Sequence, residues 1–98
     1  MKIVEKMIEQ VKEELEGARC YAEKYLEHKA RGDSARAGKY REMAQDELHH
    51  AASVHDFATT DIESLRRIYT LPVETEEHVQ HMHKHYAECV AMVKHMLA

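Results

Sequence analysis

Histidine is strongly over-represented in the sequence. Nine of the 98 residues are histidines, and five of these lie between His78 and His95. Imidazole changes its charge near neutral pH and is the commonest protein ligand of transition metals. Among the other four histidines, His50 follows Glu47 at the spacing Glu-x-x-His. Residues three apart share a helix face, so this carboxylate and this imidazole can bind one divalent metal ion together.

Glu47, His50 and a third ionisable residue, Glu14, stand where helical periodicity predicts apolar side chains. The stripe at positions 4, 7, 11, 14, 18, 21 and 25 is interrupted by Glu14. The stripe at positions 40, 43, 47, 50, 54 and 57 is interrupted by Glu47 and His50. Stripes of this period face the core of a helical protein, so we expect all three ionisable groups to face the core.

The helices that carry these residues are predicted over 2–31, over 34–58 with a continuation over 61–70, and over 73–98. Gly32 can take the left-handed conformation that ends a helix. A capping-box pattern at 60–63 predicts a bend near Thr60, and Pro72 interrupts the helix before it. The short connection at Gly32 forces an antiparallel hairpin.

In such a hairpin, residues equally far from the turn lie side by side. His50 is then almost level with Glu14, and Glu47 lies within about one turn of them at 1.5 Å rise per residue. Unpaired buried carboxylates are costly, and one bound cation would compensate all three groups. A hydrogen-bonded pair of Glu14 and His50, or a salt bridge at an interface, is the alternative that needs no metal.

Composition places these helices in one small all-α domain spanning residues 1–98. Three glycines, one proline and no tryptophan, with 33% charged residues, argue against a sheet fold. So short a chain buries a modest core, which favours help from a metal or a partner chain. With a net charge of −4 and no long apolar run, we expect no nucleic-acid partner, no membrane span and a cytoplasmic location. Cys20 and Cys89 are expected as buried thiols.

The segments 14–21 (ELEGARCY) and 44–51 (AQDELHHA) resemble the first hairpin of the ferritin-like superfamily, nearest to rubrerythrin-type proteins. There a glutamate on the first helix is followed, one hairpin later, by Glu-x-x-His on the second. The resemblance implies that Glu14, Glu47 and His50 are metal ligands. It also implies that Tyr21 and, more weakly, Asp46 interact with those ligands without binding the metal themselves.

The resemblance covers roughly residues 10–58, and the chain has no second Glu-x-x-His. A complete di-metal bundle needs one glutamate from each of two helices and Glu-x-x-His from each of the other two. One chain therefore provides half of a site, and a homodimer would form the four-helix bundle. The resemblance implies a di-iron centre, with manganese or zinc as replacements. It also implies a ferroxidase or peroxidase-like oxidoreductase that handles iron or reduces oxygen or peroxide; the electron donor is left open.

The third helix offers a competing set of ligands: His81, His85, Glu77, Glu88 and His78. Three interpretations stay open for this helix, namely a solvated polar face, a separate metal site, or completion of the Glu14 site. Two other functions follow as alternatives: a redox-silent module that binds or stores divalent metal, and a structural helical oligomer. The remaining histidines, at positions 28, 49, 55 and 83, are expected in solvent.

Overall fold

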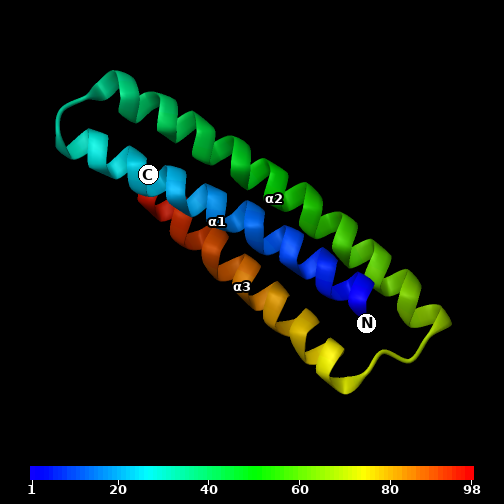
Figure 1. Cartoon of the computed structure of the whole chain (residues 1–98). Helices are drawn as coiled ribbons and strands as arrows, with labels where there is room; N and C mark the ends of the chain where they lie inside the picture. The colour runs from blue at the N-terminus through cyan, green and yellow to red at the C-terminus, as the bar shows by residue number, and fades with distance from the viewer.

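The computed structural model describes residues 1–98 as three helices without strands, which confirms the all-α prediction. Helix α1 spans Lys2–Ala30, α2 spans Ser34–Ile68 and α3 spans Val73–Leu97. They form a rod with extents of 54 × 19 × 17 Å, in which α1 lies between α2 and α3 in the view of Figure 1. None of the three helices has a stretch long and apolar enough to span a bilayer.

The turn between α1 and α2 forms as its residues predict. Gly32 has φ +75°, in the left-handed region that a residue without Cβ adopts at little cost. Asp33 caps α2, because its side chain accepts a hydrogen bond from the Arg36 backbone N–H at 3.1 Å. The two helices therefore run antiparallel (Figure 1), so that residues equally far from the turn lie side by side, as predicted for Glu14 and His50.

Helix α2 continues through Thr60, so the predicted bend there is wrong. Ala58 and Ile62, one turn apart, are both buried and keep the apolar stripe in phase across this point. The nearby hydroxyls bond back into the same helix. Thr59 Oγ1 donates to the His55 carbonyl at 2.8 Å and Ser64 Oγ to the Thr60 carbonyl at 3.2 Å.

Small side chains along α1 and α2 allow these helices to pack closely. Ala18 and Ala22 of α1, and Ala44 and Ala51 of α2, are fully buried. The core consists of two clusters. One includes Leu15 and Ala51, and the other, towards the turn, includes Ala18, Ala22 and Ala44. The positions expected to hold metal lie at the level where the two clusters meet.

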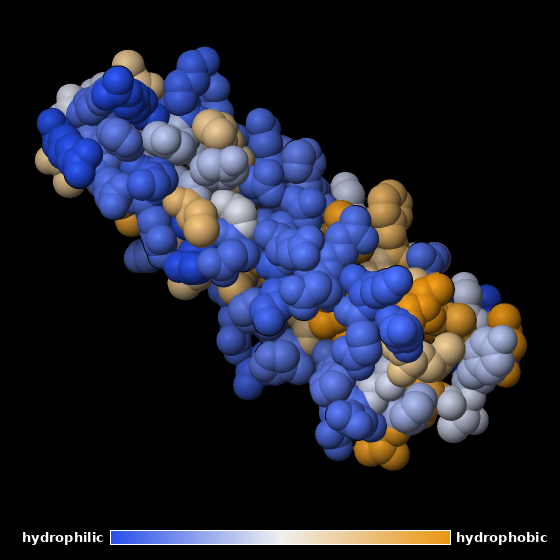
Figure 2. All heavy atoms as spheres, in the orientation of Figure 1, coloured by the Kyte–Doolittle hydropathy of each residue, from blue (hydrophilic) through white to orange (hydrophobic).

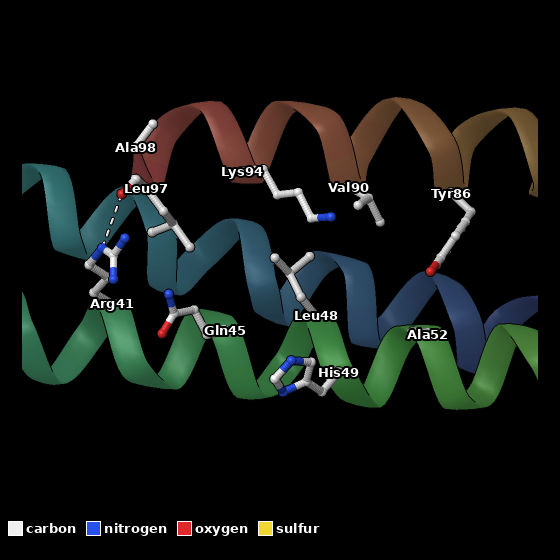
Figure 3. A pocket seen from close by; sticks show the side chains of 10 residues that line it. All are labelled: Arg41, Gln45, Leu48, His49, Ala52, Tyr86, Val90, Lys94, Leu97 and Ala98. Atoms are coloured by element: carbon white, nitrogen blue, oxygen red, sulfur yellow. Dashed lines mark hydrogen bonds between the residues drawn. The ribbon is translucent and has the colours of Figure 1, made fainter.

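Helix α3 packs mainly on α1 and touches α2 little. In the loop 69–72, Leu71 is buried and Pro72 is the N-cap of α3. At the same end of the rod, the N-terminal ammonium donates to Thr75 Oγ1 at 2.9 Å. A groove of about 550 Å³ remains between α2 and α3 (Figure 3), closed at one end where Arg41 Nε donates to the Leu97 carbonyl at 3.0 Å.

Candidate metal centre

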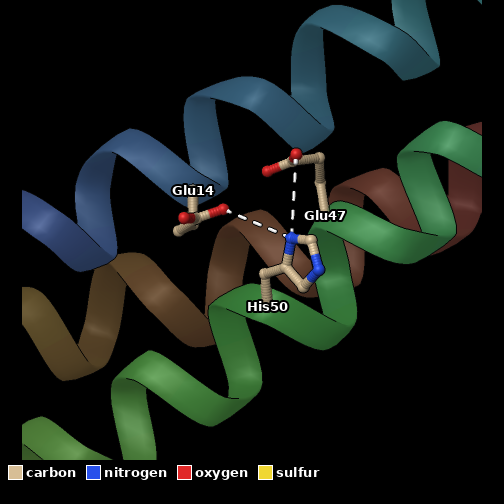
Figure 4. Close-up of side chains that lie close together, drawn as sticks. All are labelled: Glu14, Glu47 and His50. Atoms are coloured by element: carbon tan, nitrogen blue, oxygen red, sulfur yellow. Dashed lines mark ion pairs between the residues drawn. The ribbon is translucent and has the colours of Figure 1, made fainter.

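Glu14, Glu47 and His50 converge in the structure. Glu14 projects from α1, and Glu47 and His50 project from α2 towards it (Figure 4). The Nδ1 atom of His50 lies 3.8 Å from Glu14 Oε2 and 3.8 Å from Glu47 Oε1. One ligand atom from each of the three residues lies within 4.8 Å of the others.

This donor set fits a divalent cation. Ligand atoms bound at about 2.0–2.2 Å from one ion lie roughly 3–4 Å apart, depending on the coordination angle. The observed separations of 3.8 Å are therefore reached without moving a helix. Two carboxylates and one imidazole suit iron and manganese, and they accept zinc.

The carboxylates of Glu14 and Glu47 repel each other when both are ionised, and a bound cation would neutralise this repulsion. A hydrogen bond shared with Glu14 raises the pKa of Glu47, and partial burial raises that pKa further. The negative charges of Glu14 and Asp46 act in the same direction, whereas His50 lowers the pKa. Crowded like charges of this kind occur at sites whose function uses them.

A glycine that the sequence interpretation missed makes room for Glu47. A Cβ on Gly17 would lie 3.0 Å from Glu47 Oε2 and 3.4 Å from its Cδ. Gly17 is in the interior of α1, where glycine costs about 0.5–1 kcal/mol relative to alanine. The signal in the sequence was a mid-helix glycine one turn after Glu14, which sequence reasoning did not use.

Replacing Gly17 with alanine is expected to separate stability from metal binding. The variant should unfold at higher urea concentration, because helix propensity improves by about 0.5–1 kcal/mol. It should bind Fe(II) or Mn(II) more weakly, because the new Cβ displaces the Glu47 carboxylate.

Gly38→Ala is the matched control, since Gly38 is also within a helix and has open space around its Cα. It should gain stability and keep its metal affinity. Equal metal affinities for Gly17→Ala and the parent would show that the close approach of Gly17 to Glu47 has no role in the site.

The three residues are less buried than predicted. The side chains of Glu14 and Glu47 are 28% and 24% exposed, and that of His50 is 61% exposed. The prediction that they face a closed core is wrong for the single chain. The reason is geometric: they lie on the flank of the α1–α2 hairpin away from α3, and no element of this chain covers that flank.

This flank, which we call the site face, also carries exposed apolar side chains. By helical phase, Ile3 of α1 lies on the side of Glu14. In the same way, Met43, Phe57 and Ile68 of α2 lie on the side of Glu47. Their exposed fractions are 52%, 39%, 68% and 72%, respectively. Figure 2 shows apolar side chains gathered at the end of the rod near the α2–α3 loop.

The two residues expected to support the ligands form no hydrogen bond with them. Tyr21 packs its ring near that of Tyr40, with centroids 6.2 Å apart, and makes no hydrogen bond to Glu14 or Glu47. Asp46 is exposed and acts on Glu47 through its charge alone. Neither residue belongs to the Glu14 cluster, and a supporting role for either stays a prediction.

The histidines of α3 form a separate group and contribute no ligand to the Glu14 cluster. His78, His81 and His85 line a hollow of about 250 Å³ against α1, together with Glu5 and other residues. His78 Nδ1 lies 2.6 Å from Glu5 Oε1, and this hydrogen bond raises the pKa of His78.

The two acids that the sequence placed with these histidines have exposed side chains, and one of them, Glu88, lines a small hollow with His85. Glu77 is exposed, and Glu88 pairs with Lys84 at 3.9 Å. The structure therefore does not bring Glu77 and Glu88 together with the α3 histidines into a metal-binding group.

Three histidines expected in solvent are packed instead. His28 stacks on Tyr40 with ring centroids 5.3 Å apart, and its Nδ1 is buried without a hydrogen-bond partner. His55 Nε2 lies 2.8 Å from His83 Nδ1. The expectation missed these contacts because it placed residues by the α1–α2 stripes alone. His49 is exposed, as expected.

Both cysteines are free thiols, as expected, but only one is sheltered. Cys20 is exposed on α1, and Cys89 is half-buried on α3 beside His85, with Sγ 3.5 Å from Nε2. Burial raises the pKa of the Cys89 thiol. Neither thiol belongs to the Glu14 cluster.

Comparison of the chain with protein-family models, with curated proteins and with solved structures found no match. The ferritin-like resemblance of the α1–α2 hairpin accordingly stays a prediction from residues 10–58. The geometry itself supports a narrower statement. This all-α chain brings two carboxylates and one imidazole together as a candidate metal centre on an uncovered helical face.

Proposed function

We propose that two copies of the chain join through their site faces and enclose a carboxylate-bridged di-metal centre that oxidises Fe(II). The observation that carries this proposal is the cluster of Glu14, Glu47 and His50 on a flank that the chain leaves open. In a single chain its two carboxylates are partly exposed and its imidazole is mostly exposed. A second copy would cover them.

The number of ligands that each chain provides supports a dimer with twofold symmetry. Each chain offers one glutamate from α1 and one Glu-x-x-His pair from α2. Two chains offer four carboxylates and two imidazoles, which is the ligand set of di-iron bundles. Twofold dimers are the commonest homo-oligomers, and they place the same patch on both sides of the interface.

The residues would have distinct roles in such a centre. Glu47, which approaches both Glu14 and His50, would bridge or chelate, and Glu14 and His50 would each bind one ion. When bound, the ions would supply the transfer of electrons from Fe(II) to oxygen or peroxide. The chain supplies geometry and, once the site face is covered, shelter from water.

A charge on the site face tests the interface. Phe57 is 68% exposed, so replacing it with glutamate should leave the single chain folded, within about 0.5 kcal/mol of the parent. Burying that charge between two chains would be costly. We therefore expect Phe57→Glu to sediment as a monomer where the parent forms a dimer.

Val73→Glu is the control for Phe57→Glu, because Val73 is 76% exposed and belongs to α3, which contributes no residue to the site face. It should assemble as the parent does. If Phe57→Glu dimerises normally, the site face is not the interface.

Loading the protein with Fe(II) without oxygen, and then admitting oxygen, tests the activity. The proposal predicts rapid growth of ferric absorbance and repeated turnover with further Fe(II). Binding without oxidation would instead support the redox-silent storage module. No binding at all would support a structural oligomer in which Glu14, Glu47 and His50 only fix the register of the helices.

A further inference from the structure

Two histidines from different helices meet between α2 and α3, away from the site face. His55 Nε2 and His83 Nδ1 lie 2.8 Å apart, and both residues are half-buried. Their rings are nearly perpendicular, at 88°. Tyr86 stacks flat on the His55 ring, at 3.9 Å between centroids and 2° between planes. The His55 ring is thus held in a fixed orientation with its Nε2 aimed at the other helix.

The surroundings of this pair favour an uncharged His55 ring. Neither ring forms an ion pair with a carboxylate, whereas His50 and His78 each lie near two carboxylates. Burial lowers the pKa of His55, and His83 lowers it further, although the charge of Asp56 acts in the opposite direction. A neutral imidazole keeps the lone pair that a metal ion needs.

We propose that His55 and His83 form a second metal site, which holds a borderline divalent transition-metal ion such as zinc between the two ring nitrogens. Two nitrogens bound at about 2.0–2.1 Å from one ion lie roughly 2.9–3.4 Å apart for angles between square and tetrahedral. The observed 2.8 Å therefore needs only a small opening of the pair. Imidazoles without carboxylates suit zinc, nickel and copper rather than the hard ions expected at Glu14.

Binding of a metal ion by His55 and His83 releases no proton from the two rings. In the free protein one of the two rings donates its N–H to the other across the 2.8 Å contact. When the ion takes that place, the donor ring carries its proton on its other nitrogen, and both facing nitrogens give lone pairs to the ion. Water completes the coordination, since the site is half-exposed.

An ion bound by His55 and His83 would link two helices that otherwise have few contacts. Helices α2 and α3 touch little, and their other links lie towards the two ends of the rod. One is the Arg41 bond to the Leu97 carbonyl, and the other is the pair of Arg66 with Glu76. An ion on His55 and His83 would join the middle of the two helices, next to Tyr86 at one end of the α2–α3 groove (Figure 3).

Zinc titration followed by ¹⁵N NMR of the histidine rings tests the proposal on the parent protein. We expect His55 Nε2 and His83 Nδ1 to shift together to the values of metal-bound imidazole. The thermal midpoint should rise with zinc concentration. If the two nitrogens keep their free shifts at a zinc concentration that saturates His50, the proposal is overturned.

Variants then separate this site from the Glu14 cluster. His83→Gln and His55→Gln, each made in the Glu47→Gln background so that zinc at the Glu14 cluster does not contribute, should weaken zinc binding at the α2–α3 site by about tenfold or more and lose the zinc-dependent rise in thermal midpoint. His49→Gln, an exposed histidine on the same helix as His55, should keep both. Glu47→Gln should also keep both, so the two sites can fail independently. A midpoint rise that already disappears in Glu47→Gln alone would assign the effect to the Glu14 cluster instead.

Discussion

Glu47→Gln is expected to abolish metal binding at the α1–α2 site and, with it, the oxidation of Fe(II). Glu47 interacts with both other ligands, through the carboxylate pair with Glu14 and the 3.8 Å contact with His50. The loss of affinity should exceed the roughly 10- to 100-fold that the loss of a supporting residue costs. Calorimetric titration with Mn(II), and ferric absorbance after admission of oxygen, measure the two effects.

The same substitution should stabilise the metal-free protein at neutral pH. The pKa of Glu47 is raised in the folded state, so its ionised form opposes folding. This penalty is fully present above the folded-state pKa and is relieved as the pH falls through that value. The free energy of unfolding of Glu47→Gln should therefore exceed that of the parent at pH 7, and the difference should shrink towards acidic pH.

Glu42→Gln provides the control, because Glu42 is an exposed glutamate on the same helix. It should bind metal as the parent does and show no comparable gain in stability. Parent-like metal binding by Glu47→Gln would rule out the Glu14 cluster as the metal centre.

His50→Gln is expected to lose oxygen-dependent iron oxidation, whereas the double variant His81→Gln/His85→Gln should retain most of it. His50 gives the only imidazole of the candidate centre. His81 and His85 lie in the hollow between α1 and α3 and contact none of its three ligands. Initial rates of ferric absorbance at saturating oxygen compare the variants.

The double variant also tests whether α3 delivers iron. Slower loading with a normal final ferric yield would fit a role of these two histidines in uptake. If the double variant is inactive and His50→Gln is competent, the α3 histidines carry the function and the ferritin-like interpretation of the hairpin fails.

The meeting of Glu14, Glu47 and His50 could be predicted because it depends on local rules. A glycine turn fixed at Gly32 sets the level of every residue along an antiparallel hairpin, and helical periodicity sets the face. The exposure of the three residues could not be predicted in the same way. Stripes show which side of each helix is apolar, but not whether a third helix or a second chain covers the pair.

The contacts of α3 were the least predictable part of the fold. Helix α3 packs on one side of α1, and the choice of side depends on the path of the loop 69–72 and the burial of Leu71. Whether His55 and His83 meet follows from that choice, not from the stripe of either helix. The continuity of α2 through Thr60 also could not be predicted from the sequence, because a hydroxyl that can cap a helix can equally donate to a carbonyl of the preceding turn.

The most direct test of the central claim is native mass spectrometry of the protein saturated with Mn(II), which counts chains and ions in the same particle. A centre built between two chains predicts a dimer that carries two ions, or multiples of that unit, and no bound ion for Glu47→Gln. A monomer that binds one ion tightly through Glu14, Glu47 and His50 would contradict the shared centre.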